Sequence, residues 1–543
     1  MSWNFGDLLE GIEAKLPGEA PALIHEERVL SWPEYARRSN NLASALVARG
    51  ARPDDKLAFY MRNGTEYMET IGAAFKARLV HVNVNFRYRD EELLYIFDNS
   101  DARFVVFAPE FRDRVEAIRG RCKKVERWIE LGGEARGFAE SYEALSADGG
   151  GQPLALERSG QDLVFMYTGG TTGMPKAVMW RHEDLWGAIG GGTTIPANRG
   201  SAPKSPAEHI ANVAAWGSGP RQLVACPLMH GTGLFSAIAS FVGGGCIATL
   251  GGSHFDAAHL LDRVEQHRLN SVVIVGDAFA RPILDALDAN PDRWDLSSLK
   301  VMISSGVMWS REVKQGLLRH HPQMALADLF GSSEAIGFGS SITRAKGESK
   351  TARFEIGERC RVFSEDRDEI VPGSGEPGYI ARSGFIPLGY YKDPEKTEKT
   401  FPTIGGTRWS IPGDWCRVEA DGTITLLGRG SACINTGGEK VYPEEVEETL
   451  KLHPDVADAL VFGTPHPRFG QAVTAVVQLQ DGRAFAERDA EEEVLRAHVG
   501  ERLASYKAPR RILAVPRMFR APNGKADYAA ARAFAEGKAS SEG

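Results

Sequence analysis

The sequence predicts an α/β protein with more than one domain. Short apolar runs alternate with helix-periodic segments through residues 20–110, a pattern typical of a parallel sheet with crossover helices. From about Val371 the chain becomes rich in glycine, proline and short strands, as expected of a small β-rich subdomain. Because 543 residues are too many for one compact core, we expect two or more domains.

The first elements follow in a strand–helix order. Residues 21–24, 57–60, 80–84 and 102–107 are strand-like, and residues 66–77 have a helical pattern. Between residues 21–24 and 57–60, Ser31 with a glutamate three residues later predicts the start of a helix. The composition of residues 145–160 indicates a loop that contains a glycine run.

Later segments continue this pattern. Residues 271–276 and 301–306 are expected to be buried strands that end at glycine, and residues 491–503 a helix with an apolar face. Residues 223–255 contain no Asp, Glu, Lys or Arg, but glycines and a proline break them into pieces far shorter than the roughly 20 residues of a spanning helix. We expect a buried helix and strand there, and no transmembrane segment.

Composition indicates a soluble, cytoplasmic protein. Hydrophobic residues make up 43% and charged residues 25% of the chain, and the net charge of −8 argues against a general nucleic-acid binder. The six cysteines are scattered without a Cys-x-x-Cys pair, which predicts reduced thiols with neither a zinc site nor a disulfide framework. The N-terminus lacks the basic-then-apolar pattern of a secretion signal.

Residues 167–179, Tyr-Thr-Gly-Gly-Thr-Thr-Gly-Met-Pro-Lys-Ala-Val-Met, follow a strand-like apolar run. Glycines allow backbone N–H groups to approach an anion, threonine hydroxyls add donors, and Lys176 adds a mobile positive charge. The Gly-Lys-Ser/Thr ending of nucleoside triphosphatase P-loops is absent. A flexible surface turn is the alternative, but this composition after a buried strand favours a phosphate-binding loop.

The loop resembles the phosphate-binding signature of the adenylate-forming superfamily, which includes acyl-CoA synthetases, luciferases and the adenylation domains of peptide synthetases. Gly169 stands where the family commonly has serine. The resemblance implies that Thr171 lies at a magnesium ion. It also implies that the ATP phosphates are bound by Thr168, Gly169, Gly170, Thr171, Thr172, Gly173 and Lys176.

A second motif, Phe-Gly-Ser-Ser-Glu at 330–334, is by itself also compatible with a capped helix N-terminus. It resembles the family's Tyr-Gly-x-Thr-Glu, which implies that Phe330 packs on adenine and that Glu334 helps to hold Mg²⁺, a cation that prefers oxygen ligands. By the same resemblance, the nucleotide is also expected to contact Ser305, Gly306, Asp328, Gly331, Ser332 and Ser333.

Three further matches follow in the family's order. Taken alone, Pro-Gly-Asp at 412–414 is typical of an ordinary turn. A lysine near the chain end is, taken alone, most often a charge exposed to solvent. The resemblance implies that Asp414 and Arg429 bind ribose and phosphate and that Gly437 and Gly438 lie beside the CoA arm. It makes Lys525, in Asn-Gly-Lys, the catalytic contact to the carboxylate substrate and the α-phosphate.

The resemblance completes the expected organisation. Residues 1–429 form a large N-terminal adenylation domain of parallel-sheet α/β subdomains plus the β-rich subdomain, and residues 433–543 form a small, mobile α+β C-terminal domain. The hinge at 430–432 has Ser431 and Ala432 where the family usually has lysine and aspartate. The glycine-rich 373–378 matches a dinucleotide-binding pattern only formally, because it precedes a strand and does not open a helix.

The activity implied is that of an acyl-CoA synthetase that uses ATP, Mg²⁺ and coenzyme A. Strings such as Asn-Val-Asn-Phe-Arg-Tyr at 83–88 are most similar to bacterial synthetases for long-chain fatty and steroid side-chain acids. His230, Gly231 and Phe235 are expected to line the pocket of a bulky hydrophobic carboxylic acid, a small-molecule substrate. The protein is expected to be a monomer or homodimer. The alternatives are an amino-acid- or aryl-acid-activating adenylation enzyme and a non-catalytic sensor; the former usually has an aspartate where Phe235 and Ser236 stand.

Overall fold

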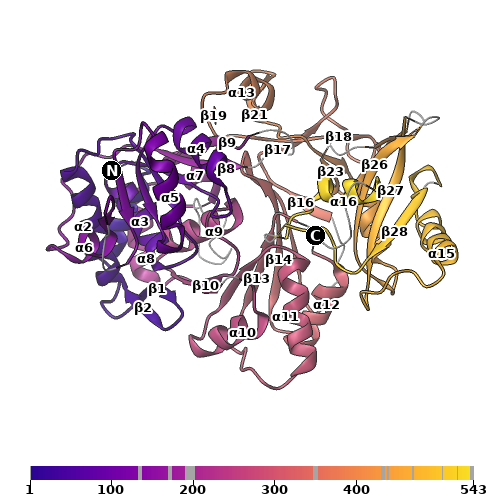
Figure 1. Ribbon diagram of the computed structural model, residues 1–543, viewed down its shortest axis with the longest axis horizontal. Coiled ribbons are helices and arrows are strands. Elements are labelled where there is room, and N and C mark those ends of the chain that lie inside the picture. Colours follow the sequence, from indigo (N-terminus) through magenta and orange to yellow (C-terminus); the bar gives the residue numbers. More distant parts are fainter. Residues whose placement is uncertain are drawn as a thin grey trace.

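The computed structural model describes residues 2–132, 137–168, 174–189, 202–252, 254–307, 309–346, 353–429, 434–436, 439–466, 470–503, 505–521 and 524–537. Within them, two large sheets lie side by side in the N-terminal part and a third, smaller sheet belongs to the C-terminal part (Figure 1). The predicted hinge, 430–432, lies outside the described residues.

The first sheet is formed almost entirely by the first 181 residues. Its strands, in spatial order, are β19 (Gly389–Tyr390), β9 (Lys176–Arg181), β8 (Leu163–Thr168), β4 (Val80–Asn83), β3 (Lys56–Tyr60), β5 (Ala102–Phe107), β6 (Arg127–Glu130) and β7 (Glu140–Ser141). The helices of this region are α1 (Phe5–Glu13), α2 (Trp32–Ala48), α3 (Thr65–Lys76), α4 (Asp90–Asn99), α5 (Arg112–Ile118), α6 (Tyr142–Ala147), α7 (His182–Ile189) and α8 (Pro206–Trp216), with 3₁₀ turns at Pro109–Phe111 and Arg119–Arg121.

The second sheet begins as a parallel α/β sheet and continues into the β-rich subdomain. Its strands run in the order β2 (Arg28–Ser31), β1 (Pro21–His25), β11 (Cys246–Thr249), β10 (Arg221–Val224), β12 (Ser271–Ile274), β13 (Val301–Ser305), β14 (Ala325–Ser332), β15 (Ala335–Thr343), β16 (Arg353–Ile356), β23 (Ile424–Arg429), β22 (Asp414–Val418), β18 (Pro377–Ser383), β21 (Thr407–Ser410) and β20 (Thr403–Ile404), while β17 (Cys360–Phe363) pairs with β18. Its helices are α9 (Gly231–Val242), α10 (Ala257–Gln266), α11 (Asp277–Ala289), α12 (Arg311–His320) and α13 (Pro394–Thr400).

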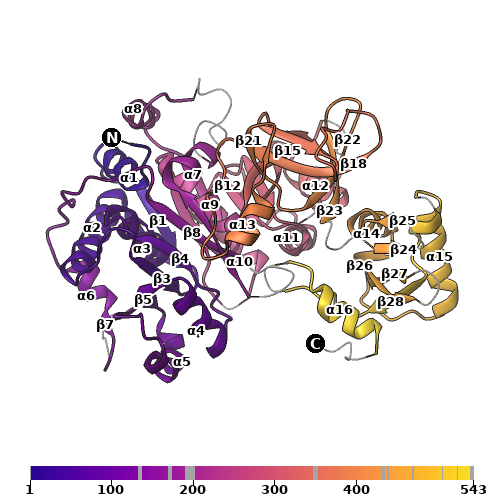
Figure 2. The same cartoon turned by 90° about the horizontal axis from the view of Figure 1, so that it is seen from above.

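The C-terminal part has a sheet and a hydrophobic core of its own. Its strands are β25 (Glu439–Val441), β24 (Ile434–Thr436), β27 (Gly470–Leu479), β26 (Val456–His466) and β28 (Arg511–Val515). Its helices are α14 (Pro443–Lys451), α15 (Arg488–Gly500) and α16 (Tyr528–Ala535), with a 3₁₀ turn at Ser505–Lys507. Seen from above, the sheet and α15 stand apart from the N-terminal domain, while the chain before α16 runs back toward it (Figure 2).

The α/β class predicted from the sequence is confirmed. Strands β10, β12, β13 and β14 pair in parallel, as do β3, β4 and β5. Helix α2 begins after Ser31, whose side chain accepts a hydrogen bond from the Glu34 N–H at 3.4 Å. The apolar segment 223–255 contains α9 and β11, the helix and strand that were expected. In the part of the chain that is described, no helix combines the length and the apolar character needed to cross a membrane.

Two expectations differ from the structure. The β-rich subdomain begins before Val371, because Phe330 and Phe354 already belong to its core. The alternative interpretation of 330–334 as a helix N-terminus is wrong: residues 330–332 end β14, and Ser333 and Glu334 form the turn to β15, which pairs antiparallel with β14. The loop at 330–334 is therefore held between two strands of the sheet.

Candidate active site

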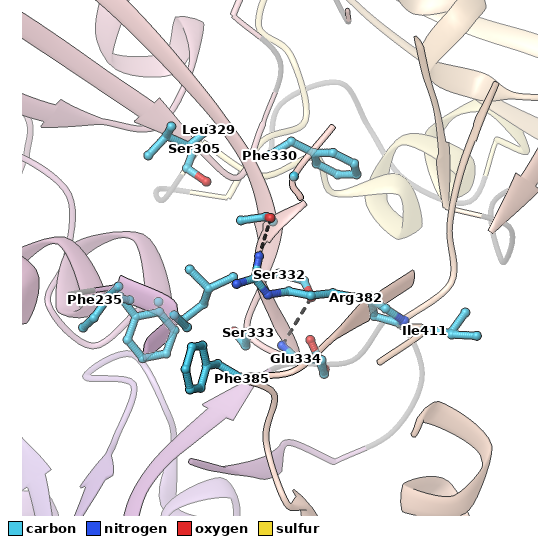
Figure 3. Close-up of a pocket in the computed structure, with 18 of the residues that line it drawn as sticks. Phe235, Ser305, Leu329, Phe330, Ser332, Ser333, Glu334, Arg382, Phe385 and Ile411 are labelled. Atoms are coloured by element: carbon cyan, nitrogen blue, oxygen red, sulfur yellow. Dashed lines mark hydrogen bonds between the residues drawn. The ribbon is translucent and has the colours of Figure 1, made fainter. Parts of the chain in front are cut away.

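A cavity of about 1890 Å³ brings together residues that are far apart in the sequence. Part of its lining is drawn in Figure 3, including Phe235, Ser333, Glu334 and Phe385. Of the predicted site residues, the cavity is lined by Thr168, Lys176, His230, Gly231, Phe235, Ser305, Gly306, Phe330, Gly331, Ser332, Ser333, Glu334 and Lys525. The loop residues Gly169, Gly170, Thr171, Thr172 and Gly173, together with Gly437 and Gly438, lie outside the described residues.

The ends of several strands contribute to this lining. Thr168 ends β8, Ser305 ends β13 and Ser332 ends β14. Strands β13 and β14 are parallel, so their carboxyl ends open on the same edge of the sheet. Ligands of open α/β sheets bind at that edge, where the chain leaves the strands. Gly306, just beyond β13, has φ +95°, a conformation that favours glycine.

Glu334 is held at the cavity by three hydrogen bonds. The Tyr390 hydroxyl donates to its Oε1 at 2.8 Å, and the Ser410 hydroxyl donates to its backbone carbonyl at 2.7 Å. Its backbone N–H donates to Ser332 Oγ at 3.2 Å, a bond drawn in Figure 3. Within the described ranges no group of three His, Cys, Asp or Glu side chains is placed to hold a metal. One carboxylate fits Mg²⁺, which usually takes its other ligands from substrate phosphates and water.

Lys176 opens β9 and forms an ion pair with Asp393 at the cavity wall. Asp393 is also the N-cap of α13, where its carboxylate accepts from the Lys396 N–H at 3.0 Å. The hydrogen bond from Lys176 holds the pKa of Asp393 below its usual value. The Lys176 ammonium group therefore lies at the cavity wall paired with the Asp393 carboxylate, which an anionic ligand can replace as its partner.

His230 is the N-cap residue of α9 and lines the cavity. Burial lowers its pKa to about 4, and the positive charges of Lys525 and Arg87 act in the same direction. The imidazole is therefore neutral near pH 7. His230 and Lys525 both line the cavity, although they are far apart in the sequence.

Lys525 reaches the cavity from the C-terminal domain. The preceding Gly524 has φ +79°, and a Cβ added there would lie 2.7 Å from Ala278 Cβ in the first turn of α11. A residue with a side chain could come this close only if Ala278 moved. The loop tip thus packs on the N-terminal domain, and Lys525 lines the cavity although the residue is exposed.

Phe330 lines the cavity from the side of the β-rich core. Its ring lies 5.3 Å from that of Phe338 and 5.4 Å from that of Phe354, measured between centroids. Nearby, the Trp180 indole N–H donates to the Ser333 carbonyl at 2.9 Å. The loop is therefore fixed by an aromatic cluster on one side and by β9 on the other.

Two predicted nucleotide contacts are placed differently. Asp328 forms a buried ion pair with Lys314 at 3.0 Å, and burial raises the pKa of its carboxyl. Asp414 is buried at the start of β22, opposite Arg429 in the register of β22 and β23. Neither aspartate is part of the described cavity lining, and the side chain of Arg429 lies outside the description. Their roles in binding ribose, adenine or phosphate stay predictions.

The sequence analysis did not identify several residues that organise the site. Asn83 donates to the carbonyls of Tyr167 at 2.9 Å and Met229 at 2.8 Å, and accepts from the Tyr167 N–H at 2.6 Å. It thereby ties the end of β8 to the segment before His230. A polar residue at the end of a buried strand was the available signal for Asn83. The Asp-Pro pair at 393–394 signals a helix start but not its ion pair.

One end of the cavity is apolar and aromatic. The Phe235 ring meets that of Trp180 edge-on at 6.3 Å, and Trp3 stacks on Trp186 at 4.7 Å. Gly187 faces the Phe385 ring, which an added Cβ would meet at 2.4 Å. All of these except Trp180 line the cavity. Such a wall suits a large apolar ligand group.

Comparison with known proteins agrees with this arrangement. The family model described as AMP-binding enzyme matches residues 12–391, and the model described as AMP-binding enzyme C-terminal domain matches residues 445–525. A medium/long-chain-fatty-acid–CoA/3-oxocholest-4-en-26-oate–CoA ligase of Mycolicibacterium smegmatis is 40% identical over 556 residues, covering 100% of this chain and 98% of the relative.

A 3-oxocholest-4-en-26-oate–CoA ligase of Rhodococcus rhodochrous is also 40% identical, over 97% of this chain and 95% of its own length. Among solved structures, the anthranilate CoA ligase AuaEII in complex with anthranoyl-AMP superimposes with a TM-score of 0.81. It is 22% identical and covers 98% of each chain, so the likeness concerns the fold.

Proposed function

This chain belongs to the AMP-binding enzyme family, and we propose that it is an ATP-dependent acyl-CoA synthetase. It would convert a hydrophobic carboxylic acid, ATP and CoA to acyl-CoA, AMP and pyrophosphate through an acyl-adenylate. The observation that carries this proposal is that Lys525, from the C-terminal domain, lines the same cavity as Lys176 and Glu334. Two cations and one carboxylate there match the charges of a metal-bound triphosphate and a carboxylate substrate.

In the first step, a carboxylate oxygen attacks the α-phosphorus of ATP and pyrophosphate leaves. Lys525 offsets the negative charge that gathers at the reacting phosphorus, because it is a compact positive charge at the cavity wall. When ATP binds, Lys176 leaves its ion pair with Asp393 and binds the β- and γ-phosphates. The loop 168–173 donates hydrogen bonds to the same phosphates. Glu334 would hold Mg²⁺, which neutralises phosphate charge when bound.

In the second step, the CoA thiol attacks the carbonyl of the adenylate and AMP leaves. We propose that the C-terminal domain turns about residues 430–432, which withdraws Lys525 and brings Gly437 and Gly438 beside the thiol arm. Neutral His230 leaves the mouth of the acyl pocket uncharged during this attack. The hinge sequence, with small side chains at Ser431 and Ala432, is compatible with a large backbone rotation.

The proposed substrate is a long-chain fatty or steroid side-chain acid. Support comes from the aromatic end of the cavity around Phe235, Phe385 and Trp186 and from the activities named for the two relatives that are 40% identical. Phe235 and Ser236 stand where an amino-acid-activating enzyme would place an aspartate. We propose that the enzyme works in the cytoplasm, as a monomer or homodimer.

The test is pyrophosphate release with ATP, Mg²⁺ and CoA across a panel of acids. The panel contains short fatty, long fatty, aromatic, steroid side-chain and amino acids. Release that depends on CoA and is greatest with a large apolar acid supports the proposal. Release with an amino acid that is indifferent to CoA assigns the chain to amino-acid activation, and silence with every acid assigns it to a sensor.

A further inference from the structure

The loop that carries Lys525 is tied to the C-terminal sheet on both sides. Within residues 519–527 the described backbone forms a narrow turn: the Ala521 N–H donates to the Lys525 carbonyl at 2.8 Å, and the Gly524 N–H donates to the Ala521 carbonyl at 2.8 Å. An isolated bridge between Arg520 and Ala526 closes the base of the turn. The position of Lys525 therefore depends on what holds this base.

Arg520 holds the first side of the turn. Its guanidinium donates to both carboxylate oxygens of Asp458 in β26, at 2.5 and 2.7 Å. Its remaining terminal nitrogen donates to the Gly524 carbonyl at 3.1 Å, one residue before Lys525. Although burial acts in the opposite direction, Arg520 holds the pKa of Asp458 below its usual value, so the pair is charged at neutral pH. The planar guanidinium makes both contacts at once because its N–H donors are held in a fixed geometry. The ammonium group of a lysine has no such geometry.

Tyr528 holds the second side. It begins α16, and its hydroxyl donates to Glu447 Oε1 in α14 at 2.9 Å. The same oxygen accepts from the Val461 N–H of β26 at 2.8 Å, so the anchor belongs to the core of the domain. Side chains five residues before and three residues after Lys525 are thus both tied to acids on α14 and β26.

The described part of the turn meets the N-terminal domain through Gly524, which lies against Ala278 and Val275 at the start of α11. This is a packing contact, whereas the anchors at the base are an ion pair and a hydrogen bond to an acid. The direction in which Lys525 points is therefore set inside the C-terminal domain, before the two domains meet.

We propose that Arg520, paired with Asp458, is a positioning residue for adenylate formation: it holds the Gly524–Lys525 turn in the shape that delivers the ammonium to the reacting phosphorus. This inference rests on the proposed function. Because the thioester-forming step takes place after Lys525 has been withdrawn, loss of the Arg520 contacts affects the first step and spares the second. Arg520 touches no substrate and acts only through Lys525.

The experiment measures the two half-reactions separately in the full-length enzyme. ATP–pyrophosphate exchange reports adenylate formation, and thioester formation from the preformed acyl-adenylate and CoA reports the second step. Both use the acid that gives the wild type its highest rate in the panel above. The variants are Arg520→Ala, Arg520→Lys and Asp458→Asn. The control is Arg488→Ala, whose side chain in the same domain is 58% exposed and lies 4.0 Å from its nearest acid, Glu492.

We expect Arg520→Ala to lower exchange on the order of 100-fold, the size of effect that a misplacement of about 1 Å has on a reacting group. Thioester formation stays within about twofold of wild type in the same preparation. Arg520→Lys keeps the charge but not the contact with Gly524, so exchange falls by an intermediate factor. Asp458→Asn falls between wild type and Arg520→Ala, and the control is unchanged.

Two results overturn the inference. Equal losses in both half-reactions assign Arg520 a general role in folding the domain, and full exchange in Arg520→Ala means that Lys525 is positioned without it. Failure of the proposed function gives a different result, because the wild type itself then exchanges pyrophosphate with none of the acids. The wild-type measurement separates the two cases.

Discussion

The hydroxyl of Tyr390 provides a direct test of the metal role assigned to Glu334. It donates to Glu334 Oε1 at 2.8 Å, while the ring is 4% exposed and packs against Phe401 at 5.9 Å between centroids. Tyr390→Phe keeps this packing and removes only the donor. A hydrogen bond to a charged carboxylate contributes about 1.5–3 kcal/mol, and loss of such a partner lowers the affinity of a metal site about 10–100-fold.

The assay is ATP–pyrophosphate exchange at saturating ATP and acid, titrated with Mg²⁺. We expect Tyr390→Phe to raise the Mg²⁺ concentration that gives half-maximal exchange by about tenfold, with the maximal rate recovered at high Mg²⁺. The matched control is Tyr391→Phe, because the neighbouring hydroxyl donates to Asp101 at 2.6 Å. An unaltered Mg²⁺ titration in Tyr390→Phe, or an equal shift in the control, refutes the assignment of the metal to Glu334.

Three other predictions follow from the site. Lys525→Ala should lower pyrophosphate exchange on the order of 100-fold or more while ATP binding, measured by calorimetry, is largely unchanged. If the variant exchanges pyrophosphate at the wild-type rate, Lys525 has no catalytic role. Because the pKa of His230 is lowered to about 4, its imidazole is already neutral at pH 6. Titration of His230 should therefore contribute no inflection near pH 6.5 to the pH profile of kcat/KM. If the wild type has such an inflection and His230→Asn abolishes it, His230 is not neutral in the site. Lys314→Ala leaves Asp328 buried without its ion-pair partner, and should lower the free energy of unfolding by about 3–5 kcal/mol in urea denaturation. The double variant Lys314→Met/Asp328→Leu should recover most of that loss, unless the pair itself is the main source of stability.

The sequence predicted the parallel strands and the lining that follows from them. Strand β12 is buried along its whole length, whereas buried and half-buried positions alternate along β13, and both strands end near glycine. Once such strands are parallel, residues just beyond them, such as Ser305, must gather at one edge. Local pattern therefore sufficed for this half of the site. Helix boundaries were less accurate, since α15 spans Arg488–Gly500 and not 491–503.

Antiparallel pairings were not predictable from local pattern. Tyr390 reaches Glu334 because β19 pairs with β9, with Tyr390 opposite Val178 more than 200 residues earlier. The same short segment brings Asp393 to Lys176. A two-residue strand has no detectable periodicity, and its register is decided by the packing of the whole sheet. The residues that orient the two predicted phosphate and metal contacts were therefore missed.

Lys525 shows why a motif and its physical cause are separate questions. The pattern Asn-Gly-Lys identified the lysine, but its charge is useful only where a left-handed glycine allows the turn to approach Ala278. The energy that shapes the turn comes from Arg520, which contacts both Asp458 and the Gly524 carbonyl, inside the C-terminal domain. At its tip, the described part of the turn contacts the N-terminal domain through Gly524, which lies against Ala278 and Val275. In the proposed two-step reaction, a lysine that enters the site for one step and leaves it for the next needs a turn whose shape is kept within its own domain.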